Sequence, residues 1–163
     1  MTNPVTSDPS AITLRAVRLS YPHLFVPWSY SGPGAQPGQP GKFQTNILIP
    51  KTDKENLALL QNAYKAAIAK VAATKFGGKV PADLRRPYYD GDQLTPTGKE
   101  PGEECKGHIV LTAKSSTKPA VYFKNTKTEA RPEDAWAGQE AHVSVKLAVY
   151  TGLSMGVTAY LNA

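Results

Sequence analysis

A strand and a helix follow one another directly in residues 43–73, which read FQTNILIPKTDKENLALLQNAYKAAIAKVAA. The first part alternates apolar with polar residues and ends at Pro50, which predicts a half-buried β-strand. Residues 52–55 (TDKE) have the form of a helix capping box, and apolar side chains then recur at helical spacing until Gly77-Gly78. The segment therefore predicts a strand followed by the only long helix of the chain.

Apolar alternation elsewhere predicts further strands on both sides of this helix. Residues 12–19 alternate with a change of phase, which indicates a bulge near Ala16-Val17. Four more strands are expected after the helix, at residues 109–113, 121–123, 143–149 and 157–161. Six strands and one helix do not follow a βαβ repeat. We therefore predict a mainly β protein with one helix, an OB-fold-like small β-barrel with long loops.

The remaining segments predict one domain with a leading segment and two long loops. Residues 1–10 are expected to be a disordered N-terminal lead, and residues 11–163 a single OB-fold-like domain. Residues 20–41 and 79–106 are rich in proline and glycine, which predicts irregular loops. Since no apolar run approaches the roughly 20 residues that cross a bilayer, we expect a soluble intracellular protein.

Positive charge is concentrated in the first half of the chain. The net charge is +6, and residues 1–80 hold nine Lys or Arg against three Asp or Glu, whereas residues 81–163 hold ten of each. Several aromatic residues also lie within a few positions of a cation. Rings beside cations suit a ligand in which bases alternate with phosphates. The pattern indicates a binding surface for single-stranded nucleic acid, with a simple surplus of solubilising charge as the alternative.

The candidate nucleic-acid-binding residues form two chemical groups. Those expected to contact phosphates are Arg15, Arg18, Lys42, Lys51, Arg85, Arg86, Lys124 and Lys146, and those expected to stack on bases are Tyr21, Tyr88, Tyr89 and Tyr122. Adjacent strand residues point to opposite faces, so Tyr122 and Lys124 are expected on the exposed face and Phe123 on the other face, half in the core. A few stacking rings would suffice for binding a single strand, because stacking one base on an aromatic ring contributes about 1–3 kcal/mol to the binding free energy.

Groups that could support catalysis are sparse. Asp90-Gly91-Asp92 could hold Mg²⁺, which makes a metal-dependent nuclease the alternative function, but Asp-Gly is also a common turn and we interpret it as one. The histidines and the single cysteine, Cys105, share no metal-ligand spacing, and one cysteine cannot form an intrachain disulfide. Ser115–Thr117 is interpreted as a polar hairpin turn. We expect no enzyme activity, no metal and no cofactor.

Four segments together resemble a known family. They are RLSYPHLF at 18–25, FQTNILIPK at 43–51 followed by Thr52-Asp53-Lys54, PYYDGD at 87–92, and GVTAYLNA at 156–163. In this order they are similar to tailed-bacteriophage single-stranded-DNA-binding proteins, formerly a domain of unknown function, over nearly the whole chain. The resemblance implies an OB-fold that coats and protects single strands during phage DNA replication or recombination in the cytoplasm of the infected host, without catalytic residues.

Two features depart from this family. Its members commonly carry an acidic C-terminal tail that recruits phage replication proteins, whereas this sequence ends at Ala163 without an acidic run, so we expect a truncated tail. The segment 31–41 is also richer in glycine and proline than the resemblance requires. A monomer or a homodimer is expected, and a structural phage protein whose barrel packs against its own copies remains a further alternative.

Overall fold

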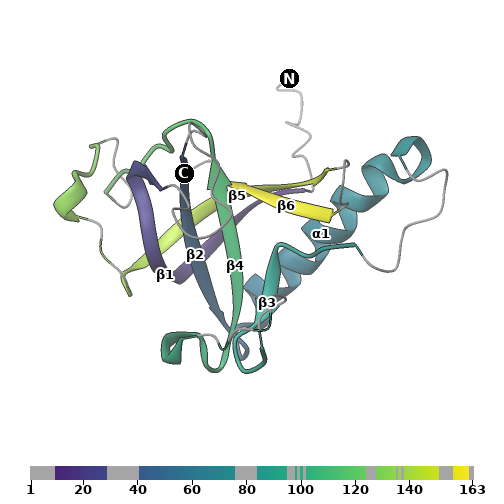
Figure 1. Cartoon of the computed structure of the whole chain (residues 1–163), viewed down its shortest axis with the longest axis horizontal. Helices are drawn as coiled ribbons and strands as arrows, with labels where there is room; N and C mark the ends of the chain where they lie inside the picture. The colour runs from purple at the N-terminus through teal and green to yellow at the C-terminus, as the bar shows by residue number, and fades with distance from the viewer. Residues whose placement is uncertain are drawn as a thin grey trace, which may run out of the picture.

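The computed structural model describes most of the chain, namely residues 10–28, 41–75, 84–94, 98, 100, 102–123, 128–134, 136, 138–150 and 156–161. Within these residues lie one α-helix and six strands (Figure 1). They are β1 (Ala11–Trp28), β2 (Lys42–Pro50), α1 (Lys54–Lys75), β3 (Tyr88–Asp90), β4 (His108–Ser115), β5 (Glu140–Tyr150) and β6 (Gly156–Leu161). Two short 3-10 helices cover Glu103–Cys105 and Pro132–Asp134.

Five of the strands close into a barrel. Their hydrogen-bonded order is β2-β1-β5-β6-β4, and β4 pairs with β2 to complete the circle. The pairing of β4 with β6 is parallel, and the other four pairings are antiparallel. The short β3 adds to β4 outside this circle. A closed five-stranded barrel with one long helix confirms the predicted OB-like fold.

A bulge lies in β1, which pairs with a different strand along each of its halves. Its first half pairs with β5 and its second half with β2, and the register against β5 shifts between Leu14 and Val17. Ala16, within the shift, has a φ of 54°, which residues other than glycine rarely adopt. Its N–H donates a hydrogen bond to Nδ1 of His142 at 3.0 Å. The predicted bulge is confirmed, and it bends the strand as bulges do.

Helix α1 is capped one residue later than the sequence motif predicts. Asp53, not Thr52, is the cap, because its Oδ1 accepts the N–H of Asn56 at 3.2 Å and its carbonyl accepts the N–H of Leu57 at 3.1 Å. The buried Asn56 side chain also reaches the bulged strand. It accepts the N–H of Arg15 at 3.1 Å and donates to the Arg15 carbonyl at 2.8 Å. Asn56 therefore fastens the first turn of the helix to β1.

The main core fills the barrel and the space between the barrel and α1, which lies along its side near β5 and β6 (Figure 1). On β5, every second side chain is buried: Val143, Val145, Leu147 and Val149. The helix contributes the buried Leu60, Ala63 and Ala67 at helical spacing. Two of these three are alanines, and small side chains allow the helix to lie close to the strands. Alternation along the strands thus divides an apolar interior from a more polar outer face.

Three strand predictions need correction. Residues 20–28 were expected to be irregular but continue β1, because they pair with β2. Residues 88–90, expected in a loop, form β3 by pairing with β4. Residues 121–123 do not form a strand, since Tyr122 makes only an isolated bridge to Glu129.

The predicted lead and the predicted glycine-rich loop fall almost entirely outside the described residues. Ser10, the last residue of the predicted lead, is buried instead, and its carbonyl accepts the N–H of Leu147 at 2.9 Å. It therefore belongs to the fold. Among the described residues, no helix combines the length and apolarity needed to cross a bilayer.

We predict that Asn56→Ala lowers the free energy of unfolding by about 1–3 kcal/mol, because it leaves two backbone groups of Arg15 without their partner. Urea denaturation measures the change. The matched control is Asn62→Ala, an exposed position on the same helix, which should be neutral or stabilising by up to about 0.7 kcal/mol. Equal losses in the two variants would contradict the assigned role of Asn56.

Candidate nucleic-acid interface

A row of outward-facing side chains crosses all five barrel strands. Register pairs His23 with Gln44, Gln44 with Lys114, Lys114 with Tyr160, and Tyr160 with Lys146. The sequence neighbours of this row point inward and are buried, among them Thr45, Ala113, Ala159 and Val145. We call His23, Gln44, Lys114, Tyr160 and Lys146 the outer belt. Although their positions in the sequence are far apart, closure of the barrel brings them together.

Within the outer belt, one aromatic residue has a lysine as its register partner on each neighbouring strand. Tyr160 is 49% exposed. Lys114 of β4 is its partner on one side and Lys146 of β5 on the other. Neighbouring strands are about 4.8 Å apart, so the two lysine stems leave the sheet roughly 10 Å from each other. This arrangement can stack one base on the ring and hold the phosphates beside it.

The hairpin made by the end of β1 and the start of β2 adjoins the outer belt. Trp28 is paired with the exposed Lys42 and is itself 43% exposed. The Trp28 ring lies 6.0 Å from the ring of His23, tilted by 31°. A second ring beside a cation therefore adjoins the belt, and it extends the basic and aromatic surface along β2.

The other predicted basic residues lie at several places on the surface. Arg15 and Arg18 are exposed on β1, and Arg85 and Arg86 are exposed just before β3. The guanidinium of Arg86 lies 6.0 Å from the centre of the Tyr88 ring. Of the eight predicted basic residues, the structure thus brings Lys42 and Lys146 to the belt region. Lys124 and the side chain of Tyr21 lie outside what the structure describes.

Tyr88 and Tyr89 are partly covered by packing. The Tyr88 ring meets the ring of Tyr64 on α1 edge to face, with their centres 5.7 Å apart. Tyr89 packs on a small buried cluster formed by Leu48, Cys105 and Val110. Burial raises the pKa of both phenols. Neither ring is an open platform in this structure, and their predicted stacking on bases stays a prediction.

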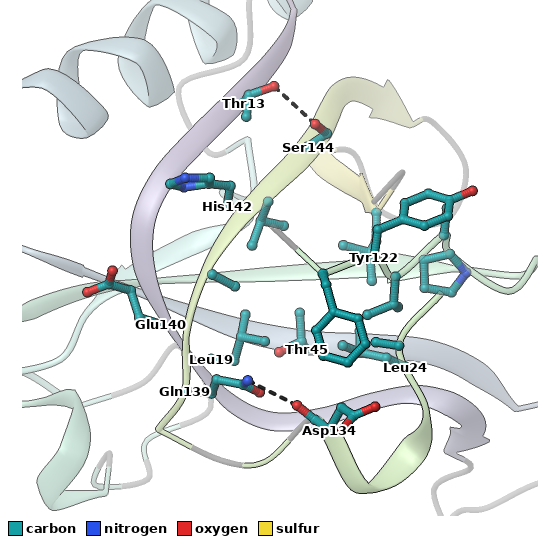
Figure 2. Close-up of a pocket in the computed structure, with 18 residues that line it drawn as sticks. Thr13, Leu19, Leu24, Thr45, Tyr122, Asp134, Gln139, Glu140, His142 and Ser144 are labelled. Atoms are coloured by element: carbon teal, nitrogen blue, oxygen red, sulfur yellow. Dashed lines mark hydrogen bonds between the residues drawn. The ribbon is translucent and has the colours of Figure 1, made fainter. Parts of the chain in front are cut away.

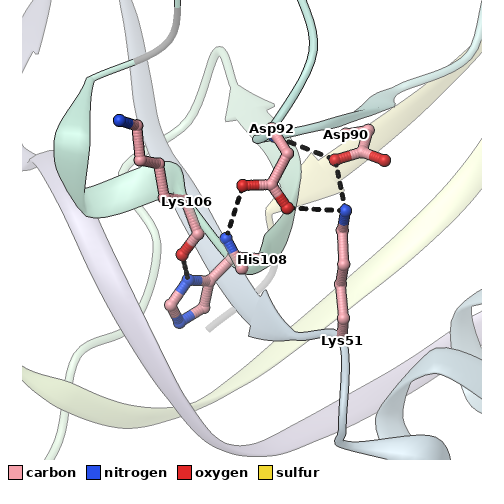
Figure 3. A network of polar contacts seen from close by, with 6 residues as sticks. Lys51, Asp90, Asp92, Lys106 and His108 are labelled. Carbon is pink, nitrogen blue, oxygen red and sulfur yellow. Dashed lines mark hydrogen bonds and ion pairs between the residues drawn. The ribbon is translucent and has the colours of Figure 1, made fainter.

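Lys51 is held in a network with two carboxylates (Figure 3). Its Nζ lies 2.7 Å from Asp90 Oδ1 and 2.7 Å from Asp92 Oδ2. Asp92 Oδ1 also accepts the N–H of Gly107 at 3.0 Å, and Asp90 Oδ1 accepts the N–H of Asp92 at 2.9 Å. Hydrogen bonding to Lys51 lowers the pKa of both carboxyls, and hydrogen bonding to Asp90 and Asp92 raises the pKa of Lys51. The charge of Lys51 is therefore engaged within the fold.

Asp90-Gly91-Asp92 forms a turn, as interpreted from the sequence. The N–H of Gly91 donates to the carbonyl of His108 at 2.9 Å. A Cβ at Gly91 would lie 1.8 Å from the carbonyl oxygen of Cys105, so only glycine fits this close approach. In the part of the chain that the structure describes, no group of three His, Cys, Asp or Glu side chains could hold a metal ion. The two carboxylates brace the turn against β2.

A cavity of about 400 Å³ opens beside the segment 119–123 (Figure 2). Much of its lining is apolar and includes Leu19, Leu24, Val121, Val143 and Leu161. Asp134 and Glu140 also line it, whereas its lining among the described residues contains no lysine or arginine. Because phosphates need cationic or amide partners, this cavity is a poorer phosphate site than the outer belt.

Tyr122 and Phe123 both line this cavity and are 49% and 45% exposed. The prediction that Phe123 lies on the face opposite Tyr122 is therefore wrong, because both rings line the same cavity and are about equally exposed. That prediction assumed the alternation of side chains along a strand, and residues 121–123 do not belong to a strand. Tyr122 is exposed as predicted, and its stacking on a base stays a prediction.

The outer belt and the hairpin beside it add residues that sequence reasoning missed, namely Lys114 and Tyr160 in the belt and Trp28 in the hairpin. Alternation with the apolar Val157, Ala159 and Leu161 could have placed Tyr160 on the outer face of its strand. Its two lysine neighbours come from other strands, so only the register of the closed barrel identifies them.

A closed OB-like barrel with cations and rings on its outer face has the architecture of an oligonucleotide-binding domain. Comparison with known proteins gives the family. Residues 10–163 match the family profile described as "Enterobacter phage Enc34, ssDNA-binding protein". The chain belongs to this family.

One curated protein is similar to this chain in sequence, and two solved structures are similar to it in fold. Putative protein p50 of Acyrthosiphon pisum secondary endosymbiont phage 1 is 29% identical, over 93% of this chain and 79% of that protein. The single-stranded DNA-binding protein of bacteriophage Enc34, solved in complex with ssDNA, shares the fold with a TM-score of 0.72 at 24% identity, covering 94% of this chain and 83% of that one. The single-stranded DNA-binding protein gp2.5 of bacteriophage T7 has a TM-score of 0.50 at 16% identity, covering 94% and 88%.

The network around Lys51 predicts a pH-dependent part of the stability. The pKa values of Asp90 and Asp92 are lowered in the folded state, so their contribution is complete above the ordinary carboxyl range, about pH 4, and is lost as the pH falls through the lower folded values. Asp90→Asn with Asp92→Asn should therefore be less stable than the parent at pH 7, and this difference should vanish under strong acid.

Urea denaturation at a series of pH values measures this difference. The control is Glu103→Gln, which removes an exposed ion pair with Lys106 and should change stability little at any pH. A difference between the parent and the double variant that stays constant from pH 7 into strong acid would contradict the role of the two carboxylates.

Proposed function

We propose that this protein binds single-stranded DNA without sequence preference, and coats and protects it during phage DNA replication and recombination. Membership of the family supports this function. On the molecule itself, the observation that carries it is the position of Tyr160 between Lys114 and Lys146 on the exposed face of the barrel. Trp28 beside Lys42 extends the same surface.

The chemistry of this surface supports binding without sequence preference. Every base has a flat face that can stack on an aromatic ring, and every nucleotide has a phosphate that a lysine can bind. The net charge of +6 attracts the polyanion from a distance and raises the association rate. Rings and lysines together thus recognise features that all single strands share.

We further propose that the protein acts without catalysis. Asp90 and Asp92, the residues of the alternative nuclease hypothesis, are engaged with Lys51 and the turn that follows β3. The protein would work in the cytoplasm of the infected bacterium as a monomer or homodimer, together with phage replication proteins.

We predict that affinity for an oligo-dT strand falls with salt, with a slope of log K against log[salt] of about −0.7 for each phosphate neutralised. Fluorescence anisotropy at several salt concentrations measures the slope. Single-stranded RNA and duplex DNA of equal length serve as comparison ligands. Salt-independent binding of oligo-dT, or no binding at low salt, would contradict the proposed function.

We also predict that Asp90→Asn with Asp92→Asn leaves the affinity for oligo-dT intact or slightly raised. The substitutions remove two anions near Arg85 and Arg86 in sequence and release Lys51 from its ion pairs. Incubation of labelled DNA with Mg²⁺, followed by a denaturing gel, should show no cleavage by either protein. Mg²⁺-dependent degradation by the parent that disappears in the double variant would instead establish the nuclease.

A further inference from the structure

The cavity beside the segment 119–123 differs in chemistry from the outer belt (Figure 2). In the part of the chain that the structure describes, none of the five belt residues lines it. We propose that this cavity binds a segment of another protein in which a large apolar side chain adjoins an arginine. The site would give the protein a second ligand, and the inference does not depend on DNA binding.

The size and the lining of the cavity suit one apolar side chain with its neighbours. The volume of about 400 Å³ lies within the range of sites that bind small ligands. Four of its lining residues, Leu19, Leu24, Val143 and Leu161, are buried members of the main core. A leucine or an aromatic ring that enters the cavity therefore leaves water for apolar surroundings, which favours binding.

Backbone hydrogen bonds hold the walls of the cavity in place. On one side, the N–H of Ala130 donates to the carbonyl of Val121 at 2.8 Å. On the other side, the N–H of Leu19 donates to the carbonyl of Gln139 at 2.9 Å, and Gln139 Nε2 donates to the carbonyl of Asp134 at 3.0 Å (Figure 2). The site is thus formed before a ligand arrives, and little conformational entropy is lost on binding.

Three exposed aromatic residues belong to this region. Tyr122 and Phe123 line the cavity and are about half exposed, and Trp136 is 58% exposed. The N–H of Trp136 donates to Oε1 of Gln139, a lining residue, at 3.1 Å. Large apolar side chains exposed together mark interaction surfaces, and aromatic residues are enriched in protein interfaces. Aromatic faces also attract the guanidinium of an arginine.

The region around the cavity is acidic, although the whole chain has a net charge of +6. Residues 128–140 contain four carboxylates and a single basic residue, Arg131. Arg131 Nε lies 3.5 Å from Glu133 Oε1, so its charge already has a partner. This acidic region repels phosphates and attracts cationic groups, which is the charge pattern that a basic protein segment requires.

Asp134 is the carboxylate placed to bind the cation. Its Oδ2 accepts the N–H of Arg131 at 2.8 Å, which orients the side chain and leaves Oδ1 without a partner among the described residues. Glu140 also lines the cavity, but its carboxylate points away from Tyr122 and Asp134 (Figure 2). Glu140 therefore adds to the negative potential, and Asp134 supplies the direct contact.

These groups favour arginine over lysine. A guanidinium has a flat face that stacks on aromatic rings and a fork of N–H donors that matches a carboxylate. Tyr122 and Phe123 offer the rings, and Asp134 offers the carboxylate. The ammonium of lysine is a strongly hydrated point charge and uses the rings less well.

A peptide titration of the full chain, followed by ¹H–¹⁵N NMR, tests the proposal. The probe is the capped peptide Gly-Leu-Arg-Leu-Gly, and two comparison peptides replace its arginine by the neutral citrulline or both leucines by serine. The probe should give saturable shifts at the amides of Ala130 and Gln139 and at the indole of Trp136. Each comparison peptide should bind about 10-fold more weakly, because it lacks the charge or the apolar side chains.

Two variants assign the contacts. Asp134→Asn should weaken binding of the arginine peptide about 10-fold and remove the difference between arginine and citrulline. The matched control, Glu103→Gln, removes one exposed carboxylate elsewhere and should bind the probe like the parent. Phe123→Leu keeps an apolar side chain without the ring and should weaken binding of the arginine peptide several-fold. Thermal melting checks the fold of each variant, and the comparison of peptides on the parent protein needs no variant.

Repeating the titration with saturating oligo-dT separates this site from the outer belt. The peptide should bind with the same affinity and cause the same shifts. Displacement of the peptide by oligo-dT, with shifts of the same cavity residues, would assign the cavity to DNA. Shifts of these residues that grow with protein concentration, together with a doubled mass in solution, would show that a second copy of the chain occupies it.

Three further results would overturn the proposal. They are the absence of saturable shifts at the cavity, equal affinities for the arginine and citrulline peptides, and equal behaviour of Asp134→Asn and Glu103→Gln. Failure of the parent to bind oligo-dT at low salt is a different result, because it rejects the proposed function and leaves the peptide titration to decide on the cavity.

Discussion

The bend in β1 at Ala16 is the constraint on which the barrel depends. One strand must pair with β5 along its first half and with β2 along its second, and it can do so only by changing direction. The bend places a non-glycine residue at a φ of 54°, which is unfavourable by itself. Side-chain hydrogen bonds offset this unfavourable backbone conformation. His142 accepts a hydrogen bond from the N–H of Ala16, and Asn56 hydrogen-bonds to both the N–H and the carbonyl of Arg15. Because Asn56 also lies in the first turn of α1, the bend and the helix are fixed together.

Closure of the barrel creates the proposed DNA-binding surface. Without the parallel pairing of β4 with β6, Lys114 would not lie beside Tyr160, and the antiparallel pairing with β5 adds Lys146 on the other side. The inner faces of the same strands are apolar and buried. One set of backbone hydrogen bonds therefore organises the core on one face and a basic, aromatic row on the other.

Charged residues in this protein serve both the fold and the proposed function. Lys51 was expected to contact phosphate, and Asp90 with Asp92 could have held a metal, yet the three side chains bind one another and brace the turn after β3. Gly91 makes this possible by its close approach to the backbone of Cys105. A charge counted in the sequence is thus not always a charge available to a ligand, since a nearby opposite charge is an equally good partner.

The sequence by itself determined the β-rich class, the long helix, the β1 bulge and the family resemblance, because these depend on local alternation, helical spacing and short motifs. It also predicted that rings and cations form the surface, and it named Lys42 and Lys146. Only the tertiary structure decided which rings are open: Tyr88 and Tyr89 are partly covered, Phe123 is exposed, and Tyr160 lies between two lysines. The physical reason is that alternation assigns a side chain only to a face of its own strand. The neighbours of that side chain across the sheet depend on the register of strands that are distant in sequence. That register is fixed only when the barrel closes.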